Sequence, residues 1–194
     1  MTLLFLIPII AYVIGSIPVG FLIACCFGVE DIRLHGSGNI GATNVGRVLG
    51  APFFLLVFFL DFIKAYGFLY AATKLGVPPN VIMMSAVALL LGNGCSIFLN
   101  FQGGKLIATS AGIVTFVHPL LSAMLVLVWL IAFCVIRIVG ISSVIGLFFL
   151  PLIGWYLNVS RNAFLLLWFI AAWGIWRHQK NIINYVKKPI GKLK

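Results

Sequence analysis

The chain has 194 residues, of which 63% are hydrophobic and only 8% are charged. Soluble domains carry about 25% charged residues, so this composition excludes a water-soluble globular protein and indicates a protein that lies in lipid. The net charge of +10 comes with no nucleic-acid motif, and six of the 13 basic residues fall in the last 18 positions. We therefore expect a basic tail near anionic lipid head groups and no nucleic-acid partner.

The apolar residues form continuous runs, which predict membrane-spanning helices rather than the alternating strands of a β-barrel. A span needs about 20 residues, so the chain holds at most about seven or eight. The sequence predicts an all-α, polytopic transmembrane bundle that forms a single membrane-embedded domain over residues 1–194. The predicted spans lie near residues 3–27, 52–75, 81–100, 106–117, 119–138, 141–159 and 162–176.

Two of these apolar runs differ from an ordinary internal span. The fourth, 106–117, is short for a span, so we expect it to be tilted or partly re-entrant. The first begins MTLLFLIPII, which lacks the basic region and the cleavage site of a signal peptide, so we expect a retained span.

Seven spans place the two termini on opposite sides of the membrane. The basic tail predicts a cytoplasmic C-terminus and an N-terminus outside. The same counting places the loops at 28–51, 101–105 and 138–141 on the cytoplasmic face, whereas Lys74 and Arg161 fall on the other face. We therefore expect the polar, glycine-rich loops to converge on one site that faces the cytoplasm.

The first polar segment is HGSGNIGATNVGR, residues 35–47. Its glycines let backbone N–H groups approach a ligand, and successive N–H donors can form a nest for an anion. An ordinary polar connector is the alternative, but a connector does not need four glycines, two asparagines and an arginine. The candidate site residues here are Ser37, Gly38, Asn39, Thr43, Asn44 and Arg47.

Asp61 and Lys64 lie deep in the second apolar run, where charged side chains are costly and are functional candidates by default. Their spacing of three residues lets them pair on one face of a helix. The sequence leaves a structural brace and a catalytic pair equally open. We place the two residues beside the site, as structural or supporting residues.

The second polar segment is NFQGGKLIATSAG, residues 100–112. Gly103, Gly104 and Lys105 directly precede an apolar helix, so backbone amides, the helix dipole and a cation would all favour an anion such as phosphate. The spacing is not that of a Walker A motif. The alternative is a lysine that extends from a helix end to the membrane surface.

The third polar segment is WRHQKNI, residues 176–182, where the last span leaves the membrane. His178 and Asn181 are three residues apart and can share one side of a helical turn. A single histidine here is often a solvated interface residue. Its predicted position on the same face as the other two loops favours a functional role.

Some chemistries are excluded by what the chain lacks. Its acidic residues are Glu30, Asp31 and Asp61, and only Asp61 lies within a span. A serine-hydrolase triad needs an acid to orient its base, and a glycosidase needs a pair of carboxylates, so this distribution disfavours both. No histidine has an aspartate five positions later, which excludes a His-x4-Asp acyltransferase dyad. The four cysteines show no ligand spacing, so we expect no disulfide framework, no metal site and no cofactor.

Five segments resemble, in order and spacing, the PlsY family of bacterial acyl-phosphate:glycerol-3-phosphate acyltransferases of the membrane. They are GSIPVG (15–20), GSGNIGATNVGR (36–47), DFIKA (61–65), FQGGKLIAT (101–109) and RHQKNI (177–182). The resemblance implies a seven-helix fold in the bacterial inner membrane. It also implies that an acyl group passes from acyl phosphate to the 1-hydroxyl of glycerol 3-phosphate, which gives lysophosphatidic acid and phosphate.

The resemblance further implies the catalytic residues, which are Ser37, Arg47, Lys105, His178 and Asn181. Gly38, Asn39, Thr43, Asn44, Gly103 and Gly104 would bind or shape the phosphate-binding loops. The implied partners are the two substrates, membrane lipid and an upstream acyltransferase that produces the acyl phosphate.

The chain departs from the family pattern at four positions. Asn93 stands where the family usually has histidine, Gln102 where it has lysine, Leu106 where it has glycine, and Ala65 closes a motif that usually ends in glycine. These departures make a family-derived protein with reduced activity one alternative. The other alternative, from a different class, is a membrane transporter of a phosphorylated metabolite. A transporter often shows inverted internal repeats, and we find none in the sequence.

Overall fold

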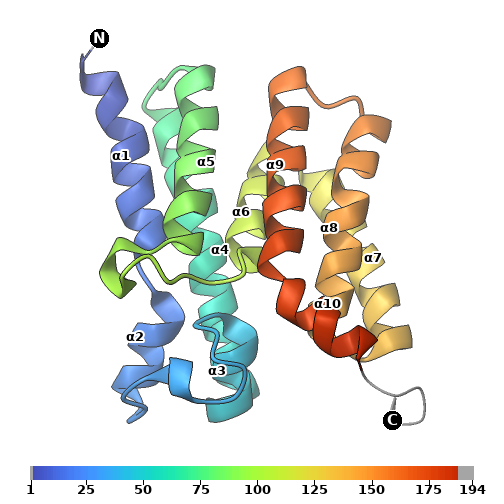
Figure 1. Ribbon diagram of the computed structural model, residues 1–194. Coiled ribbons are helices and arrows are strands. Elements are labelled where there is room, and N and C mark those ends of the chain that lie inside the picture. Colours follow the sequence, from blue (N-terminus) through green and yellow to red (C-terminus); the bar gives the residue numbers. More distant parts are fainter. Residues whose placement is uncertain (1, 188–194) are drawn as a thin grey trace. The chain divides into compact units, whose positions relative to one another are not determined.

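The computed structural model describes residues 2–187, and these residues form helices and loops without a strand (Figure 1). The predicted all-α class is confirmed. The chain divides into two compact units, an N-terminal unit (Met1–Val117) and a C-terminal unit (His118–Lys194). Three lysines of the predicted basic tail, Lys188, Lys192 and Lys194, lie outside the described residues.

The N-terminal unit consists of long helices joined by short ones. In chain order they are α1 (Thr2–Ser16), α2 (Val19–Cys26), η1 (Ile32–Leu34), α3 (Ala42–Leu49), α4 (Ala51–Lys74), α5 (Pro79–Gly94), η2 (Ile97–Leu99) and α6 (Ile107–Val117). Helix α1 packs along α5, and α4 packs against both α3 and α6. The contact of α1 with α5 is close at Gly15 and Gly92, because a Cβ on either glycine would overlap backbone of the other helix.

The interruption between α1 and α2 follows from Pro18, which cannot donate a backbone hydrogen bond and disfavours helical backbone in the residue before it. The carbonyl groups freed by this break have partners. Lys64 Nζ donates to Gly15 O at 3.1 Å and to Ile17 O at 3.0 Å, and Ser96 Oγ donates to Ser16 O at 2.6 Å. Side chains from α4 and from the turn after α5 therefore stabilise the broken end of α1.

The predicted pairing of Asp61 with Lys64 is confirmed, because Lys64 Nζ lies 2.6 Å from Asp61 Oδ1. Both side chains are about nine-tenths buried, at 10% and 9% exposed. Since the same ammonium group also binds the two carbonyl oxygens of the α1 break, this geometry supports the structural brace rather than the catalytic alternative.

The C-terminal unit contains α7 (Pro119–Ile136), α8 (Val139–Tyr156), α9 (Arg161–Arg177) and α10 (Gln179–Val186). Helix α8 packs between α7 and α9, and the short α10 lies against α8 and α9. Two helices begin at side-chain caps, since His118 Nδ1 accepts from Leu121 N and Ser160 Oγ accepts from Ala163 N. His118 therefore has a structural position at the start of α7.

Five segments of the described residues are long and apolar enough to cross a membrane, which supports a multi-pass membrane protein. They are Leu4–Cys26, Ala51–Lys74, Pro79–Leu99, Pro119–Ile136 and Val139–Tyr156. The other two predicted spans correspond to α6, with 11 residues, and α9, with 17 residues. A helix as short as α6 is about 16 Å long, roughly half the hydrocarbon thickness, so the count of seven spans stays a prediction.

Candidate active site

Asn44 organises the first polar loop. Its side chain is buried in α3, with 1% exposed, and uses both ends of its amide. Asn44 Nδ2 donates to Ile32 O at 3.2 Å and to His35 O at 2.9 Å. Asn44 Oδ1 accepts from Ser37 N at 2.7 Å and from Ser37 Oγ at 3.1 Å. The amide therefore holds the loop in shape and orients the exposed Ser37 hydroxyl.

Two glycines of this loop are required by its geometry. Gly36 and Gly38 have φ angles of +59° and +70°, in the left-handed region that other residues rarely adopt. A Cβ on Gly36 would also overlap Asn44 Oδ1. The glycine-rich composition thus produces a tight turn around one buried asparagine, and this turn presents Ser37 and Gly38 at the surface.

An ion pair lies just before the turn. The Arg33 guanidinium binds the Asp31 carboxylate through Nε, at 2.9 and 3.0 Å, and through Nη2, at 2.7 Å. Asp31 also caps η1, because its Oδ1 accepts from Arg33 N at 2.9 Å. These hydrogen bonds from Arg33 hold the pKa of the Asp31 carboxyl below its usual range, so the carboxylate stays charged and paired at neutral pH.

The second polar loop, residues 100–106, folds back on the end of α5. Gly104 N donates to Asn93 O at 2.9 Å, and a Cβ on Gly103 would overlap the backbone of Asn93 and Gly94. Glycine is therefore required at 103 for this close approach. Gly104 is buried and Lys105 is half-buried, and both residues lie just before α6.

Leu106 is the most unusual residue of this loop. It has a φ of +69°, a conformation that favours glycine, and only 2% of the residue is exposed. The glycine that the family resemblance leads us to expect here would adopt this left-handed conformation without strain, and the present chain adopts it with a leucine. Burial of the leucine side chain offsets a conformational cost of about 1–2 kcal/mol.

Two further residues of this region were not predicted from the sequence. The hydroxyl groups of Thr109 and Ser110, in the first turns of α6, are buried and have no hydrogen-bond partner among the described residues. Threonine and serine in helices often bond to a carbonyl one turn earlier. Both hydroxyls lie near the start of α6, which begins two residues after Lys105.

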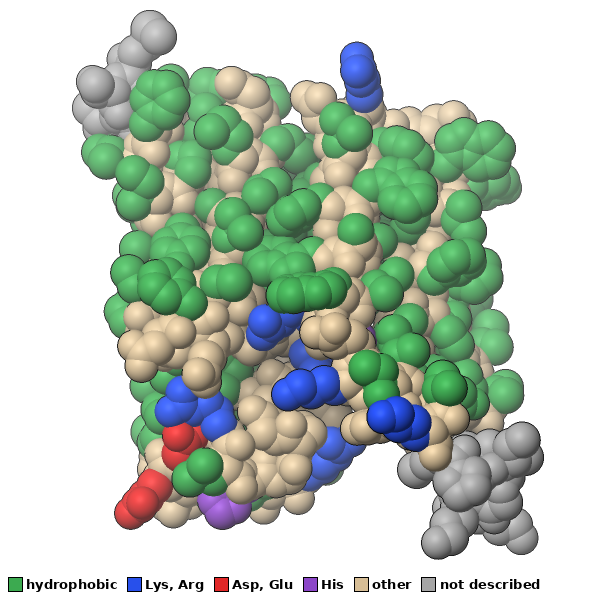
Figure 2. All heavy atoms as spheres, viewed as in Figure 1, with side chains coloured by type: hydrophobic (Ala, Val, Ile, Leu, Met, Phe, Trp, Pro, Cys, Tyr) green, Lys and Arg blue, Asp and Glu red, His purple; other side chains and the backbone are tan. Residues whose placement is uncertain are grey.

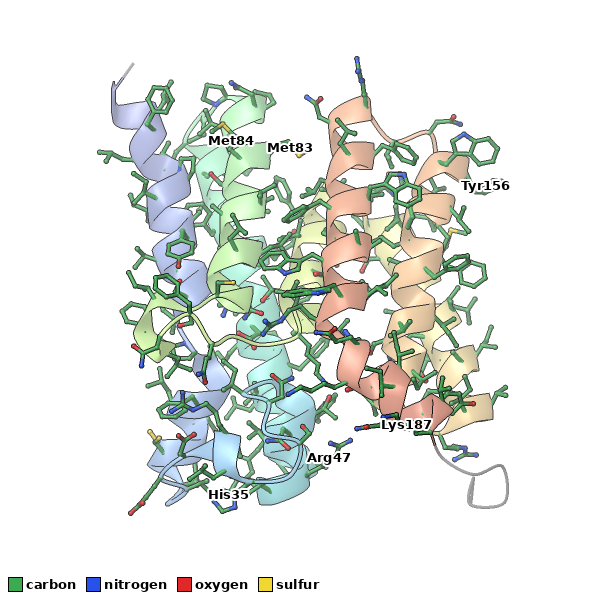
Figure 3. The ribbon with its side chains drawn as sticks, in the orientation of Figure 1. His35, Arg47, Met83, Met84, Tyr156 and Lys187 are labelled. Atoms are coloured by element: carbon green, nitrogen blue, oxygen red, sulfur yellow. The ribbon has the colours of Figure 1, made fainter. Side chains whose placement is uncertain are left out.

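The two loops lie together at one end of the N-terminal unit. Arg33 Nη1 donates to Gln102 Oε1 at 3.2 Å, and a Cβ on Gly104 would lie 3.9 Å from Ile40 Cγ1. Figure 3 shows Arg47 projecting from α3 at the same end as His35. The face of this unit in Figure 2 has hydrophobic side chains along the helices and charged ones at the end with α2 and α3. The predicted convergence of these two loops is confirmed within this unit.

His178 and Asn181 belong to the C-terminal unit. His178 lies at the junction of α9 and α10, with 2% exposed, and its Nδ1 is 2.8 Å from Gly174 O. A carbonyl oxygen only accepts, so Nδ1 carries the proton and Nε2 is an acceptor in the neutral ring. A Cβ on Gly140 would overlap Asn181 Nδ2, which places the Asn181 amide against the first turn of α8. Gly140 is not among the residues predicted from the sequence.

The fold and these loops define a class: a multi-pass helical membrane protein whose N-terminal unit gathers glycine turns, a serine and basic side chains at one end. The model of the glycerol-3-phosphate acyltransferase family matches residues 5–188. The chain is 38% identical over 177 residues to a glycerol-3-phosphate acyltransferase of Desulforamulus reducens, which covers 91% of this chain and 88% of the relative. It is 41% identical over 187 residues to that of Aquifex aeolicus, over 94% of each chain.

Two solved structures of a glycerol 3-phosphate acyltransferase resemble this chain in fold and sequence. A crystal structure of PlsY, an integral membrane glycerol 3-phosphate acyltransferase, in its glycerol 3-phosphate form matches with a TM-score of 0.88 and 37% identity, over 94% of this chain and 92% of that one. Its lysophosphatidic acid form matches with a TM-score of 0.86 and 36% identity, over 94% and 91%. The chain therefore belongs to the glycerol-3-phosphate acyltransferase family, and the predicted PlsY resemblance is confirmed.

Proposed function

We propose that this protein transfers a fatty acyl group from acyl phosphate to the 1-hydroxyl of glycerol 3-phosphate. The hydroxyl oxygen forms an ester bond with the acyl carbon, the bond from that carbon to the phosphate oxygen breaks, and the departing phosphate takes the hydroxyl proton. The products are lysophosphatidic acid and inorganic phosphate. Family membership and relatives named glycerol-3-phosphate acyltransferases support the acceptor, and a related PlsY structure in its lysophosphatidic acid form supports the product.

The observation that carries the proposal is the meeting of the two glycine loops at one end of the N-terminal unit, linked by Arg33 and Gln102. Arg47 and Lys105 would bind the phosphate charges. Gly103 and Gly104 would shape the loop that carries Lys105, since Gly104 N donates to Asn93 O. Such a site binds a phosphorylated substrate without a metal or an acidic side chain.

The remaining candidate residues have proposed roles in hydrogen bonding and in shaping the first loop. Ser37, His178 and Asn181 would hydrogen-bond to the acceptor or to the transferring group. Gly38, Asn39 and Thr43 would shape or line the first loop. The hydrogen bonds of Asn44 to the loop support a role in holding Ser37 rather than in direct contact with substrate.

The scarcity of carboxylates fits an activated donor. Asp31 is paired with Arg33 and Asp61 with Lys64, so neither is arranged as a general base toward the loops. An acyl phosphate already carries a good leaving group. Positioning of the hydroxyl and electrostatic stabilisation of phosphate would then provide most of the rate enhancement.

The proposal includes the arrangement in the membrane. The two units would act as one domain with seven spans in the bacterial inner membrane, with the site facing the cytoplasm and the acyl chain lying among the helices. An acyltransferase that makes acyl phosphate would act upstream. No cofactor is required.

The test is acyl transfer by purified protein in detergent, with palmitoyl phosphate and glycerol 3-phosphate, measured as release of phosphate and formation of lysophosphatidate. Ser37→Ala and Lys105→Ala are each expected to lower kcat/KM well over tenfold, which is more than about 1.4 kcal/mol of transition-state stabilisation. If folded wild-type protein releases no phosphate, the proposed acyltransferase activity is wrong. Uptake of glycerol 3-phosphate into proteoliposomes without acyl transfer would favour the transporter.

A further inference from the structure

Arg33 contacts three parts of the N-terminal unit at once. Its Nε and Nη2 bind the Asp31 carboxylate, and its Nη1 donates to Gln102 Oε1 at 3.2 Å. The guanidinium also lies over the Phe21 ring of α2, with Cζ 5.6 Å from the ring centroid. Side chains from α2, from the segment before the first glycine turn and from the second loop therefore meet at one arginine.

The arginine geometry suits this junction. A planar guanidinium can bind a carboxylate through two nitrogens and still direct its remaining nitrogen elsewhere, whereas an ammonium group cannot fix both directions. Asp31 is itself held in place, because it caps η1 through Arg33 N. Nη1 is thus aimed at the second loop by an ion pair that lies just before the first loop.

Gln102 is the residue directly before Gly103, Gly104 and Lys105. Backbone bonds hold both sides of it, since Gln102 N donates to Leu99 O at 3.0 Å and Gly104 N donates to Asn93 O at 2.9 Å. Its side-chain oxygen can accept from Arg33, and a lysine at this position could not accept and would place a second cation beside the guanidinium. The glutamine that departs from the family pattern is therefore the residue type that this contact needs.

We propose that Arg33 is a positioning residue that holds the second glycine loop against the first through Gln102. This inference rests on the proposed function, because it assigns the contact the task of fixing the distance between the Lys105 loop and the Ser37 turn. Loss of the contact leaves the catalytic groups present and loosens their spacing.

Loss of the contact between Arg33 and Gln102 mainly weakens the binding of glycerol 3-phosphate. This small, soluble substrate has no acyl chain and depends on polar contacts with the loops, whereas acyl phosphate is also held by its chain among the helices. A looser pair of loops therefore raises the KM for glycerol 3-phosphate more than it lowers kcat.

The test is a graded series at Gln102, an exposed position where replacement carries little risk to folding. Gln102→Met removes the acceptor, and Gln102→Lys removes it and adds a like charge. We expect the KM for glycerol 3-phosphate to rise about threefold in the first variant and about tenfold in the second, with kcat within twofold of wild type. Because repulsion between the two cations is screened by salt, the ratio of the Gln102→Lys KM to the wild-type KM falls as salt is raised.

Asn80→Lys is the matched control, because it adds the same charge at an exposed residue near the start of α5, away from the loops. Its KM stays within twofold of wild type at each salt concentration. Hydrogen exchange of peptides covering residues 99–107, measured in detergent without substrate, gives a second readout. These amides exchange faster in Gln102→Lys than in wild type and Asn80→Lys.

The outcomes separate the two proposals. A wild-type KM together with wild-type exchange in Gln102→Lys overturns the positioning role, whatever the activity of the enzyme. If wild-type protein transfers no acyl group, the proposed function fails, and the hydrogen exchange alone decides whether Arg33 and Gln102 hold the loop.

Discussion

Asn44 illustrates how one buried side chain can set the shape of a loop. Its amide has two donor hydrogens and one acceptor oxygen, and each is used by the loop that precedes α3. The Ser37 hydroxyl proton points to Asn44 Oδ1, so the serine oxygen can accept a further hydrogen bond from outside. The proposed contact of Ser37 with the acceptor substrate would use this free acceptor position.

Asn44→Ala tests this role. It leaves Ile32 O and His35 O without their donor and releases Ser37, so we expect a loss of about 2 kcal/mol or more in stability and a fall in kcat/KM of over tenfold. Thermal unfolding in detergent and the acyl-transfer assay measure the two effects. Asn184→Ala, at an exposed residue of α10, serves as the control. Wild-type activity in Asn44→Ala would contradict the assignment.

At the scale of helices, two structural features let the apolar segments pack against one another in lipid. One is the brace at the break after Ser16, where Lys64 and Ser96 supply hydrogen bonds that the helix cannot supply itself. The other is the close contact of α1 with α5 at Gly15 and Gly92, where the absence of side chains lets the backbones approach. The brace lies at the junction of α1 and α2, whereas the glycine contact joins α1 to α5.

Lys64→Met removes the brace and leaves the Asp61 carboxylate buried without its cation. Breaking a buried pair in this way costs about 3–5 kcal/mol, and we expect a matching fall in the unfolding midpoint. Since the unpaired charge accounts for much of the cost, the double variant Asp61→Asn/Lys64→Met recovers part of the loss. A double variant less stable than Lys64→Met would contradict this account of the pair.

Gly92→Ala tests the contact of α1 with α5. The added Cβ overlaps the backbone of α1, which cannot move aside as a flexible side chain can, so we expect a loss of about 1–3 kcal/mol. Gly67→Ala in α4 is the matched control, because a Cβ there meets no atom within 4 Å. It is expected to be neutral or to stabilise the helix by up to about 1 kcal/mol. Unfolding in detergent compares the two.

For the molecule as a whole, the sequence predicts an all-α membrane protein, and the helices and apolar spans of the described residues support this class. Composition and periodicity carry this information because lipid leaves few ways to satisfy a backbone. The partners of Lys64 could not be predicted, since they exist only where α1 breaks and packs near α4. The left-handed Leu106 and the contact of Arg33 with Gln102 likewise depend on tertiary positions that no local pattern encodes.

The proposed orientation can be tested by labelling single cysteines with a reagent that does not cross membranes, after replacement of the four native cysteines. His35→Cys and Lys187→Cys are expected to react only from the cytoplasmic side of vesicles, and Leu75→Cys only from the other side. All three side chains are exposed. Reaction of His35→Cys and Leu75→Cys from the same side would contradict the predicted topology.

The broken end of α1 also bears on how the protein is made. Its freed carbonyls bond to groups that lie 47 to 80 positions further along the chain, in Lys64 and Ser96. A ribosome synthesises the first hydrophobic segment well before either partner leaves the exit tunnel. The nascent segment must therefore wait in the bilayer with water, lipid head groups or the insertion machinery serving its open backbone, and it reaches its final shape only when later segments arrive.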